Sequence, residues 1–172
     1  MYCRAVVTLW VIVICCTQSM GQAAIDRFLT KKDTFSAGRF WFFAGGSSAL
    51  FSGAMIGLNS LWYSKFDRVP FQLYNDWGEW EHMDKVSHVY NAYYQSKFIY
   101  DGYRWAGVKN RDAVLAAFLT STAYQATFEI LDGQSKKWGF SIPDILANEV
   151  GSTIFAAQQY IWEEQRILIK LS

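Results

Sequence analysis

The sequence predicts an all-α protein: a bundle of about four main helices that follows an N-terminal signal peptide and that we expect to be embedded in a membrane in part. Three observations support this fold class. Long apolar stretches without a charged residue are separated by short polar segments that contain glycine or proline. Within three stretches, polar residues recur at spacings of three and four, which place them on one face of a helix. No stretch indicates a convincing strand.

The composition is that of a single domain without a nucleic-acid-binding surface. At 172 residues the chain is long enough to bury a core. Apolar residues make up 52% and aromatic residues 18%, which is rich in aromatics for a soluble domain. The 16 basic and 15 acidic residues nearly cancel, so nucleic acid is not an expected partner.

Residues 1–21 have the three parts of a secretory signal peptide. Arg4 supplies the positive charge, residues 5–16 form the apolar run, and Ser19 and Gly21 are the small residues before an expected cut at Gln22. The apolar run is shorter than the roughly 20 residues that a transmembrane helix needs. We therefore expect export to the cell envelope, as a periplasmic or membrane-associated protein, and a single helical domain over residues 22–172.

The cysteines limit the chemistry of the mature chain. Cys3, Cys15 and Cys16 are the only ones, and all lie in the predicted signal peptide. Disulfides, thiolate metal sites and cysteine nucleophiles are therefore not expected. Ile14 and Cys15 precede Cys16 where a lipoprotein signal has small residues, so we favour a cleaved signal over a lipid anchor.

Residues 40–64 form the longest uncharged stretch, which is long enough for a transmembrane helix. Small residues recur in it every four positions, at Gly45, Ala49, Gly53 and Gly57. Such a face allows another helix to approach closely. The alternatives are a membrane span and a buried helix of a soluble bundle. Trp41 and the pair Trp62-Tyr63 flank the stretch like interfacial anchors and favour the membrane.

A connecting segment follows over residues 65–83, in which Pro70 excludes a continuous helix. Its run of acidic residues around Trp77 and Trp80 suits a membrane interface or a lid over a cavity. A loop held down by the two tryptophans is at least as good an interpretation. We expect His82 to be a loop residue.

Three further helices are predicted, each with a polar stripe. The helix over residues 84–105 carries Asp84, His88, Asn91 and Gln95. The helix over residues 111–131 carries Ser121, Gln125, Glu129 and Asp132, and Gly133 is expected to end it in a left-handed conformation. The last helix carries Asp144, Asn148, Gly151, Ser152 and Phe155. Ser141, Pro143 and Asp144 are typical of a helix start.

These stripes are expected to face one another, because burying an unpaired charge costs several kcal/mol. Three chemistries fit the resulting cluster, and the sequence leaves them open. A divalent metal could be held by carboxylates and a histidine, with the candidate ligands Asp84, His88, Glu129, Asp132 and Asp144. An acid/base pair could be formed by His88 with Glu129 or Asp144. A buried network joined by Lys85 could instead fix the helices, with Asn91, Gln125 and Asn148 as members.

The order of these motifs resembles a known family. Asp84-Lys85-x-x-His88 is followed by Glu129 with Asp132, then by Gly139-Phe140-Ser141-x-x-Asp144 and Asn148-x-x-Gly151. This order is similar to that of the YfiM-like family of uncharacterised bacterial envelope proteins and, more distantly, of VanZ-like membrane proteins. The resemblance covers residues 76–152. It implies a periplasmic protein or lipoprotein, or a multi-helix membrane protein of the kind associated with glycopeptide resistance, without an established reaction.

We therefore expect an exported, membrane-associated helical bundle that binds an envelope lipid or a partner protein through its aromatic and glycine-rich faces. The alternative is a metal-assisted hydrolase or transferase that acts on a lipid-linked envelope substrate, with His88, Glu129 and Asp144 as ligands or acid/base groups. The sequence contains no HExxH motif and no phosphate-binding glycine loop. A divalent metal is the only cofactor for which there are candidate ligands.

Overall fold

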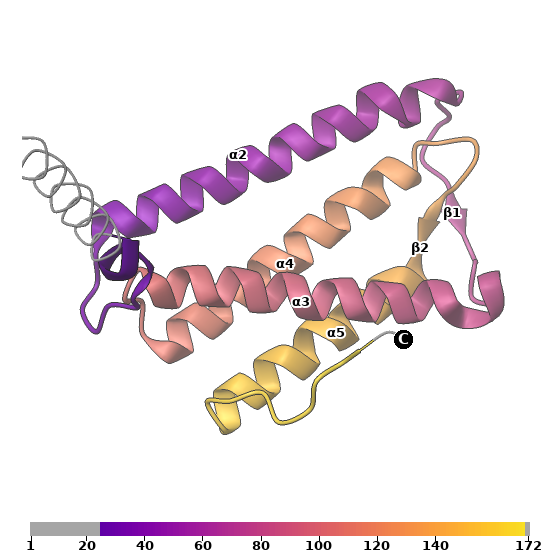
Figure 1. Cartoon of the computed structure of the whole chain (residues 1–172). Helices are drawn as coiled ribbons and strands as arrows, with labels where there is room; N and C mark the ends of the chain where they lie inside the picture. The colour runs from indigo at the N-terminus through magenta and orange to yellow at the C-terminus, as the bar shows by residue number, and fades with distance from the viewer. Residues whose placement is uncertain (1–24, 171–172) are drawn as a thin grey trace, which may run out of the picture.

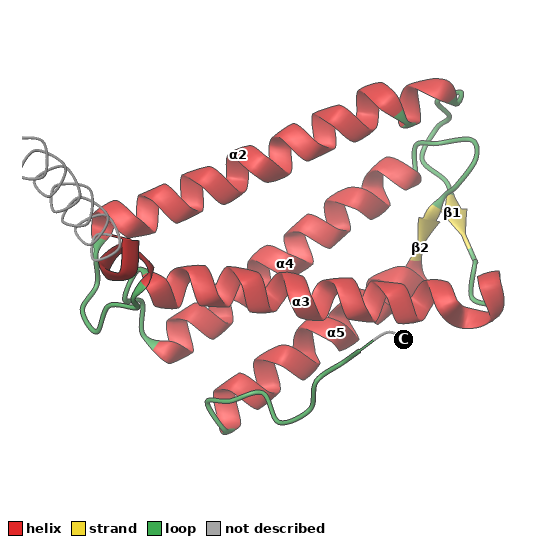
Figure 2. Cartoon of the chain, in the orientation of Figure 1, coloured by secondary structure: helices red, strands yellow, loops and turns green. Residues whose placement is uncertain are grey.

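The computed structural model describes residues 25–170, so the predicted signal peptide lies outside the described residues. Four long helices dominate it, as the sequence predicts (Figures 1 and 2). The elements in chain order are α2 (Ala37–Leu61), η1 (Tyr63–Lys65), β1 (Leu73–Tyr74), η2 (Glu79–His82), α3 (Met83–Trp105), α4 (Asn110–Asp132), β2 (Phe140–Ser141) and α5 (Ile142–Ile161).

Helices α3, α4 and α5 pack against one another and form the core (Figure 1). Phe155 of α5 is fully buried, with its ring edge-on to Tyr93 and Tyr100 of α3. The backbone of α5 lies directly against α3, because a Cβ on Gly151 would lie 2.2 Å from the carbonyl oxygen of Val89. Gly151 thus permits the close packing that brings the polar stripe of α5 to the stripe of α3.

The buried residues of the described chain are as often polar as apolar, which is unusual for a soluble bundle. Many of the buried residues are polar: Asp76, Lys85, Ser96, Ser121, Glu129, Ser135, Ser141, Asp144, Asn148, Ser152, Gln158 and Gln159. Large apolar side chains lie outside instead, including Leu50, Ile56, Leu115, Leu119, Leu146 and Val150. Exposed apolar surface of this extent is typical of a protein that contacts a membrane or a partner.

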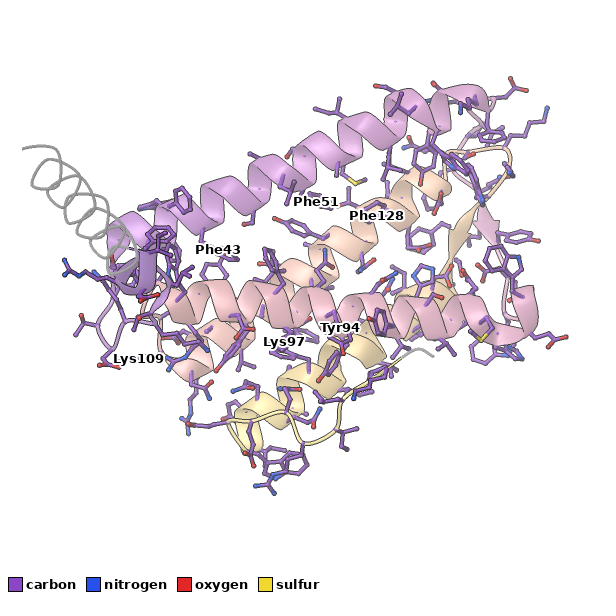
Figure 3. The ribbon with its side chains drawn as sticks, viewed as in Figure 1. Phe43, Phe51, Tyr94, Lys97, Lys109 and Phe128 are labelled. Atoms are coloured by element: carbon purple, nitrogen blue, oxygen red, sulfur yellow. The ribbon has the colours of Figure 1, made fainter. Side chains whose placement is uncertain are left out.

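Helix α2 lies beside the core rather than in it (Figure 1). Phe43 packs over Gly102 of α3, and Phe51 stacks on Tyr124 of α4, with ring centroids 3.8 Å apart. Figure 3 shows Phe51 between α2 and α4, near Phe128. By length and composition alone, residues 37–65 and 110–132 are both long and apolar enough to cross a membrane.

The prediction that the glycine face of α2 packs closely on another helix is wrong for the described chain. A Cβ built on Gly45, Gly53 or Gly57 would have no atom within 4 Å. The physical reason is that Phe43 and Phe51 reach the core from α2 and keep its backbone away from α3 and α4. The interpretation of α2 as a buried helix of a soluble bundle is also wrong, since Met55 is the one residue of this helix that is buried.

A short parallel pair of strands, which the sequence does not predict, ties the segment before α3 to the loop before α5. Leu73 pairs with Phe140, and Tyr74 pairs with Ser141. The α4–α5 loop also differs from the prediction at Gly133, whose φ of −58° is right-handed. Glycine is needed there for space, because a Cβ would lie 2.6 Å from the ring of Phe71.

Candidate functional site

The polar stripes of α3, α4 and α5 meet in the interior. Gln95 of α3 accepts hydrogen bonds from Gln125 (3.0 Å) and Ser121 (3.2 Å) of α4. Ser152 of α5 donates to Ser121 over 3.2 Å. Periodicity alone therefore identified the face that each helix turns to the others.

Two cavities follow these stripes. The first, which we call the polar groove, has a volume of about 430 Å³. It is lined by His88, Asn91, Gln95, Gln125, Phe128, Glu129 and Asp132. The second, which we call the acidic pocket, has a volume of about 220 Å³. It is lined by Tyr74, Asp76, Trp80, Asp84, His88, Asp132, Lys137, Trp138, Gly139 and Asp144. His88 and Asp132 line both, so the two cavities adjoin.

Lys85 lies beside the acidic pocket and pairs with three carboxylates. Its Nζ is 2.6 Å from Asp76, 2.8 Å from Asp84 and 2.5 Å from Asp144. Burial would lower the pKa of Lys85, but the hydrogen bonds to the three carboxylates outweigh it and raise this pKa. Burial would likewise raise the pKa of Asp76, but hydrogen bonds from Lys85 and Ser141 hold it below its ordinary value. Both groups are therefore charged at neutral pH.

Asp76 is the site residue that sequence reasoning missed. The interpretation of its segment as a loop held down by two tryptophans is wrong, because Trp77 and Trp80 are exposed. The buried anchor is Asp76 itself, which accepts a hydrogen bond from Ser141 over 2.6 Å. The one signal in the sequence was the position of Asp76 at the start of the family resemblance. His82 ends η2 in a left-handed conformation, outside the two cavities, as expected of a loop residue.

The start of α5 positions Asp144. The side chain of Ser141 accepts a hydrogen bond from the backbone N–H of Asp144 over 3.1 Å, so the predicted helix start is confirmed. A carboxylate in the first turn is also stabilised by the helix dipole. The same Ser141 joins Asp76 to α5, so one hydroxyl aligns two carboxylates of the acidic pocket.

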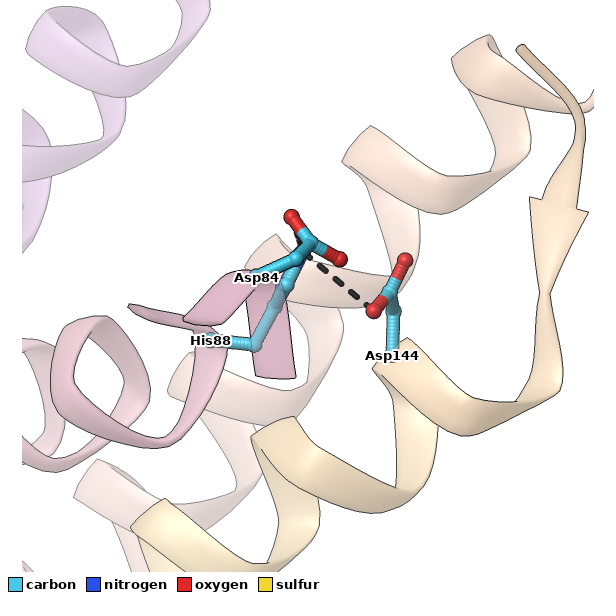
Figure 4. A group of neighbouring side chains, drawn as sticks. All are labelled: Asp84, His88 and Asp144. Carbon is cyan, nitrogen blue, oxygen red and sulfur yellow. Dashed lines mark ion pairs between the residues drawn. The ribbon is translucent and has the colours of Figure 1, made fainter. Parts of the chain in front are cut away.

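His88 connects α3 to α5. Figure 4 shows Asp84 and His88 on α3 facing Asp144 at the start of α5. The Nε2 atom of His88 is 3.5 Å from Asp144 Oδ1 and 3.8 Å from Asp84 Oδ1. Its Nδ1 atom is 3.2 Å from Asn148 Oδ1. One possible ligand atom from each of Asp84, His88 and Asp144 lies within 4.8 Å of the others.

Glu129 and Asp132, the other two candidate metal ligands, lie at the end of α4 and have separate partners. Asp132 accepts a hydrogen bond from the hydroxyl of Tyr63 over 2.7 Å. Glu129 accepts one from the backbone N–H of Ser141 over 3.3 Å. The structure thus brings three of the five candidates together and places the other two along the polar groove.

Burial shifts the ionisation of these acids. Glu129 is only 2% exposed, and burial together with the nearby charge of Asp144 raises its pKa to about 8. Burial raises the pKa of Asp144 to about 6 despite its hydrogen bond from Lys85. Burial also raises the pKa of Asp132, although the hydrogen bond from Tyr63 opposes this. At neutral pH the carboxyl group of Glu129 is therefore largely protonated and can donate a hydrogen bond into the groove.

The chain was compared with known families, curated proteins and solved structures. A family model described as predicted periplasmic lipoprotein (DUF2279) matches residues 75–160, which is half of the chain. This range begins immediately before Asp76 and contains α3, α4 and nearly all of α5. No curated protein and no solved structure matches the chain.

Proposed function

The chain belongs to the family of predicted periplasmic lipoproteins (DUF2279) and is an exported protein of the cell envelope, and from this premise we propose that it binds the headgroup of an envelope lipid in its polar groove. The closer resemblance to YfiM-like proteins, and the more distant one to VanZ-like proteins, stays a prediction. The cysteines that a lipid anchor would need all precede residue 25 and lie outside the described residues.

The first support for this proposal is the apolar exterior. Leu50 and Ile56 on α2 are 70% and 67% exposed. Trp41 and Trp62, near the two ends of this helix, are exposed as well. Aromatic residues at both ends of an exposed apolar helix suit the two interfaces of a bilayer. We expect α2 to contact the membrane.

The observation that carries the proposal is the position of the polar groove directly beside this apolar surface. Phe128 lines the groove and is covered by Phe51 of α2, with ring centroids 5.8 Å apart. Tyr63, just after α2, donates a hydrogen bond to Asp132, which also lines the groove. A lipid could therefore keep its acyl chains against α2 and α4 while its headgroup occupies the groove.

The groove lining indicates the class of headgroup. Carboxyl and amide groups predominate, and within the described chain the basic residues that line the two cavities are His88 and Lys137. Such a lining favours a primary ammonium group, which donates several hydrogen bonds, over an isolated phosphate. We therefore propose an amine-bearing headgroup, such as that of phosphatidylethanolamine.

Vesicle flotation of the full chain tests this proposal. Vesicles of phosphatidylethanolamine and phosphatidylglycerol are compared with vesicles of phosphatidylcholine and phosphatidylglycerol, because choline has no N–H donor. We expect tighter binding to the first, and we expect Gln125→Trp, which fills the groove, to remove the difference. Ala123→Trp, on the exposed face of the same helix, is the matched control. Equal binding to both vesicles by the unmodified protein would overturn the proposal, and a partner protein would then become the leading ligand.

A second candidate function is a metal-assisted hydrolase or transferase that acts on a lipid-linked envelope substrate. It is favoured by the raised pKa of Glu129, since a carboxylic acid that titrates near neutral pH is suited to general acid catalysis. Glu129 and His88 both line the polar groove. Assay of the purified protein against lipid-linked envelope precursors, with Glu129→Gln as the inactive control, tests this candidate. Turnover that is unchanged in Glu129→Gln would exclude Glu129 as the acid.

A further inference from the structure

We infer that Asp84, His88 and Asp144 form a binding site for a divalent cation of the zinc class, at the junction of the polar groove and the acidic pocket. This cation site lies in the same region as the proposed lipid site, but its existence does not depend on lipid binding. It applies whether the groove holds a lipid headgroup, another ligand or a substrate.

The ring of His88 is oriented by its contact with Asn148. An amide oxygen can only accept a hydrogen bond, so the contact with Asn148 Oδ1 places the proton of His88 on Nδ1. In the neutral imidazole, which is the form that binds a metal, the lone pair is then on Nε2 and is directed toward Asp84 and Asp144. Metal-binding histidines are commonly held this way, with the distal ring nitrogen donating to a fixed oxygen. Asn148 is itself buried, so this orientation is held firmly.

The distances from His88 Nε2 to Asp84 and Asp144 match those between ligands of one metal ion better than those of hydrogen bonds. Nε2 lies 3.5 Å and 3.8 Å from the two carboxylate oxygens, and the longer separation is well beyond a normal hydrogen bond. A protonated imidazole would pair with the two carboxylates, whereas in the neutral form Nε2 has no proton to donate and only a cation between these groups removes their repulsion. Two ligands of a tetrahedral zinc ion, each bound at about 2.0–2.2 Å, lie about 3.4 Å apart. The two separations from Nε2 thus suit ligands of one ion, and all three atoms lie within 4.8 Å of one another.

The carboxylates around Lys85 carry more negative charge than this residue neutralises. Lys85 faces the carboxylates of Asp76, Asp84 and Asp144, which leaves an excess of two negative charges. Lys85 binds Oδ2 of Asp84, so that Oδ1 remains available on the side of His88. On Asp144 it binds Oδ1, the oxygen that also faces His88, so a cation there would share this oxygen with the ammonium group. A dication would neutralise the excess while Lys85 continues to hold the carboxylates in place.

A fourth observation is an unpaired donor beside the site. Asn148 is 1% exposed, and its Nδ2 has no hydrogen-bond partner within residues 25–170. Buried amide groups are rarely left unpaired. A water molecule or another oxygen ligand on a bound ion is the kind of acceptor that this group lacks. One histidine and two carboxylates also leave a coordination position open, as in catalytic rather than structural zinc sites.

Metal titration of the full chain in the absence of lipid tests the inference. After removal of metal with a chelator, we expect about one Zn²⁺ per chain by calorimetry, and weaker binding of Mg²⁺, which prefers six oxygen ligands. His88→Ala should abolish zinc binding. His82→Ala is the matched control, because it removes the only other histidine, which lies outside both cavities.

Two further variants separate a metal site from a merely structural network. Asp144→Asn keeps the shape of the side chain but removes its charge, and it should also lose zinc. Asn148→Ala should weaken zinc binding by about 10–100-fold, as is usual for residues that orient a metal-binding histidine. If the unmodified chain binds no zinc, or if His88→Ala binds as well as His82→Ala, the inference is overturned. Because lipid is absent here and metal is absent from the flotation assay, either proposal can fail without the other.

Discussion

Lys85 is the residue whose loss should affect the site most, because its ammonium group is shared by carboxylates from the segment before α3, from α3 and from α5. Its side chain is only 10% exposed. Sequence reasoning treated it as a helper of the network. It could not identify Asp76 as a partner, because that contact depends on the fold of the segment before α3, which has no helical periodicity and is held in place by its contacts with Phe140 and Ser141.

At this scale we predict that Lys85→Met destabilises the protein by about 3–5 kcal/mol, since removing one partner of a buried ionic cluster leaves its charges uncompensated. Urea unfolding at neutral pH measures this. Lys97→Met is the control, because Lys97 pairs with Asp101 in an exposed position on the same helix, where such pairs contribute about 0.3–0.5 kcal/mol. Similar losses in the two variants would contradict a central role for Lys85.

The raised pKa of Glu129 predicts how the stability of the folded protein depends on pH. In the unfolded chain Glu129 loses its proton near its ordinary pKa of 4.5, whereas in the folded chain it keeps the proton up to about pH 8. The folded state therefore binds more protons between these values, and the contribution of Glu129 to stability falls as the pH rises through this range. Burial of Asp144 and Asp132 acts in the same direction, whereas Asp76 acts in the opposite one.

The midpoints of urea unfolding are measured at pH 5 and pH 8 for the unmodified protein and for Glu129→Gln. We expect Glu129→Gln to lose less stability than the unmodified protein over this interval, because glutamine does not ionise. The comparison between the two proteins isolates Glu129 from the other acids. An identical loss in both would show that Glu129 ionises in the folded chain as it does in the unfolded one.

Among the elements, α2 differs most from what its sequence pattern suggests. The repeated small residues indicated close helix packing, yet in the described chain the aromatic residues of the helix make its contacts with the core. At Gly151 of α5, which belongs to no such repeat, the backbone lies directly against the backbone of another helix. Spacing along one helix shows which residues share a face, but it does not show what that face touches.

A matched pair of substitutions tests this difference. Gly53→Ala should stabilise the protein by about 0.5–1 kcal/mol, because alanine is the better helix former and the new Cβ meets no atom within 4 Å. Gly151→Ala should destabilise it by about 1–3 kcal/mol, because the new Cβ would overlap the backbone of Val89. Thermal unfolding measures both. Destabilisation by Gly53→Ala would mean that a partner covers the glycine face of α2.

At the scale of the whole molecule, the combination of a partly polar interior with an apolar exterior is the feature that any function must accommodate. Polar groups from three helices are buried together, and apolar side chains lie on the outer faces of α2, α4 and α5. Hydrogen bonds such as those of Gln95 with Gln125 and of Ser152 with Ser121 join the polar stripes to one another, so these polar groups do not depend on surrounding water.

We therefore predict that charges on the outer face of α2 weaken membrane association without unfolding the core. The double variant Leu50→Lys and Ile56→Lys should float with vesicles at least tenfold less than the unmodified protein, while its thermal unfolding stays within a few degrees. Both positions are exposed, so the fold does not depend on them. The substitution of Lys31 and Lys32 by alanine, which removes charge from the exposed segment before α2, serves as control. Undiminished flotation of the double variant would exclude α2 as the membrane-contacting helix.

The sequence by itself determined the helical class, the approximate limits of the four long helices, the helix start at Ser141 and the polar stripes on α3, α4 and α5. These features depend on local spacing, capping and composition, which are properties of a few neighbouring residues. Only the tertiary structure decided which of the candidate residues converge. It brings Asp84, His88 and Asp144 together, whereas Glu129 and Asp132 take other partners. It also decided that Asp76 and Lys85 complete the acidic pocket and that the glycine face of α2 is open. These are contacts between segments distant in the chain, and they depend on how far one side chain or one Cβ holds two helices apart.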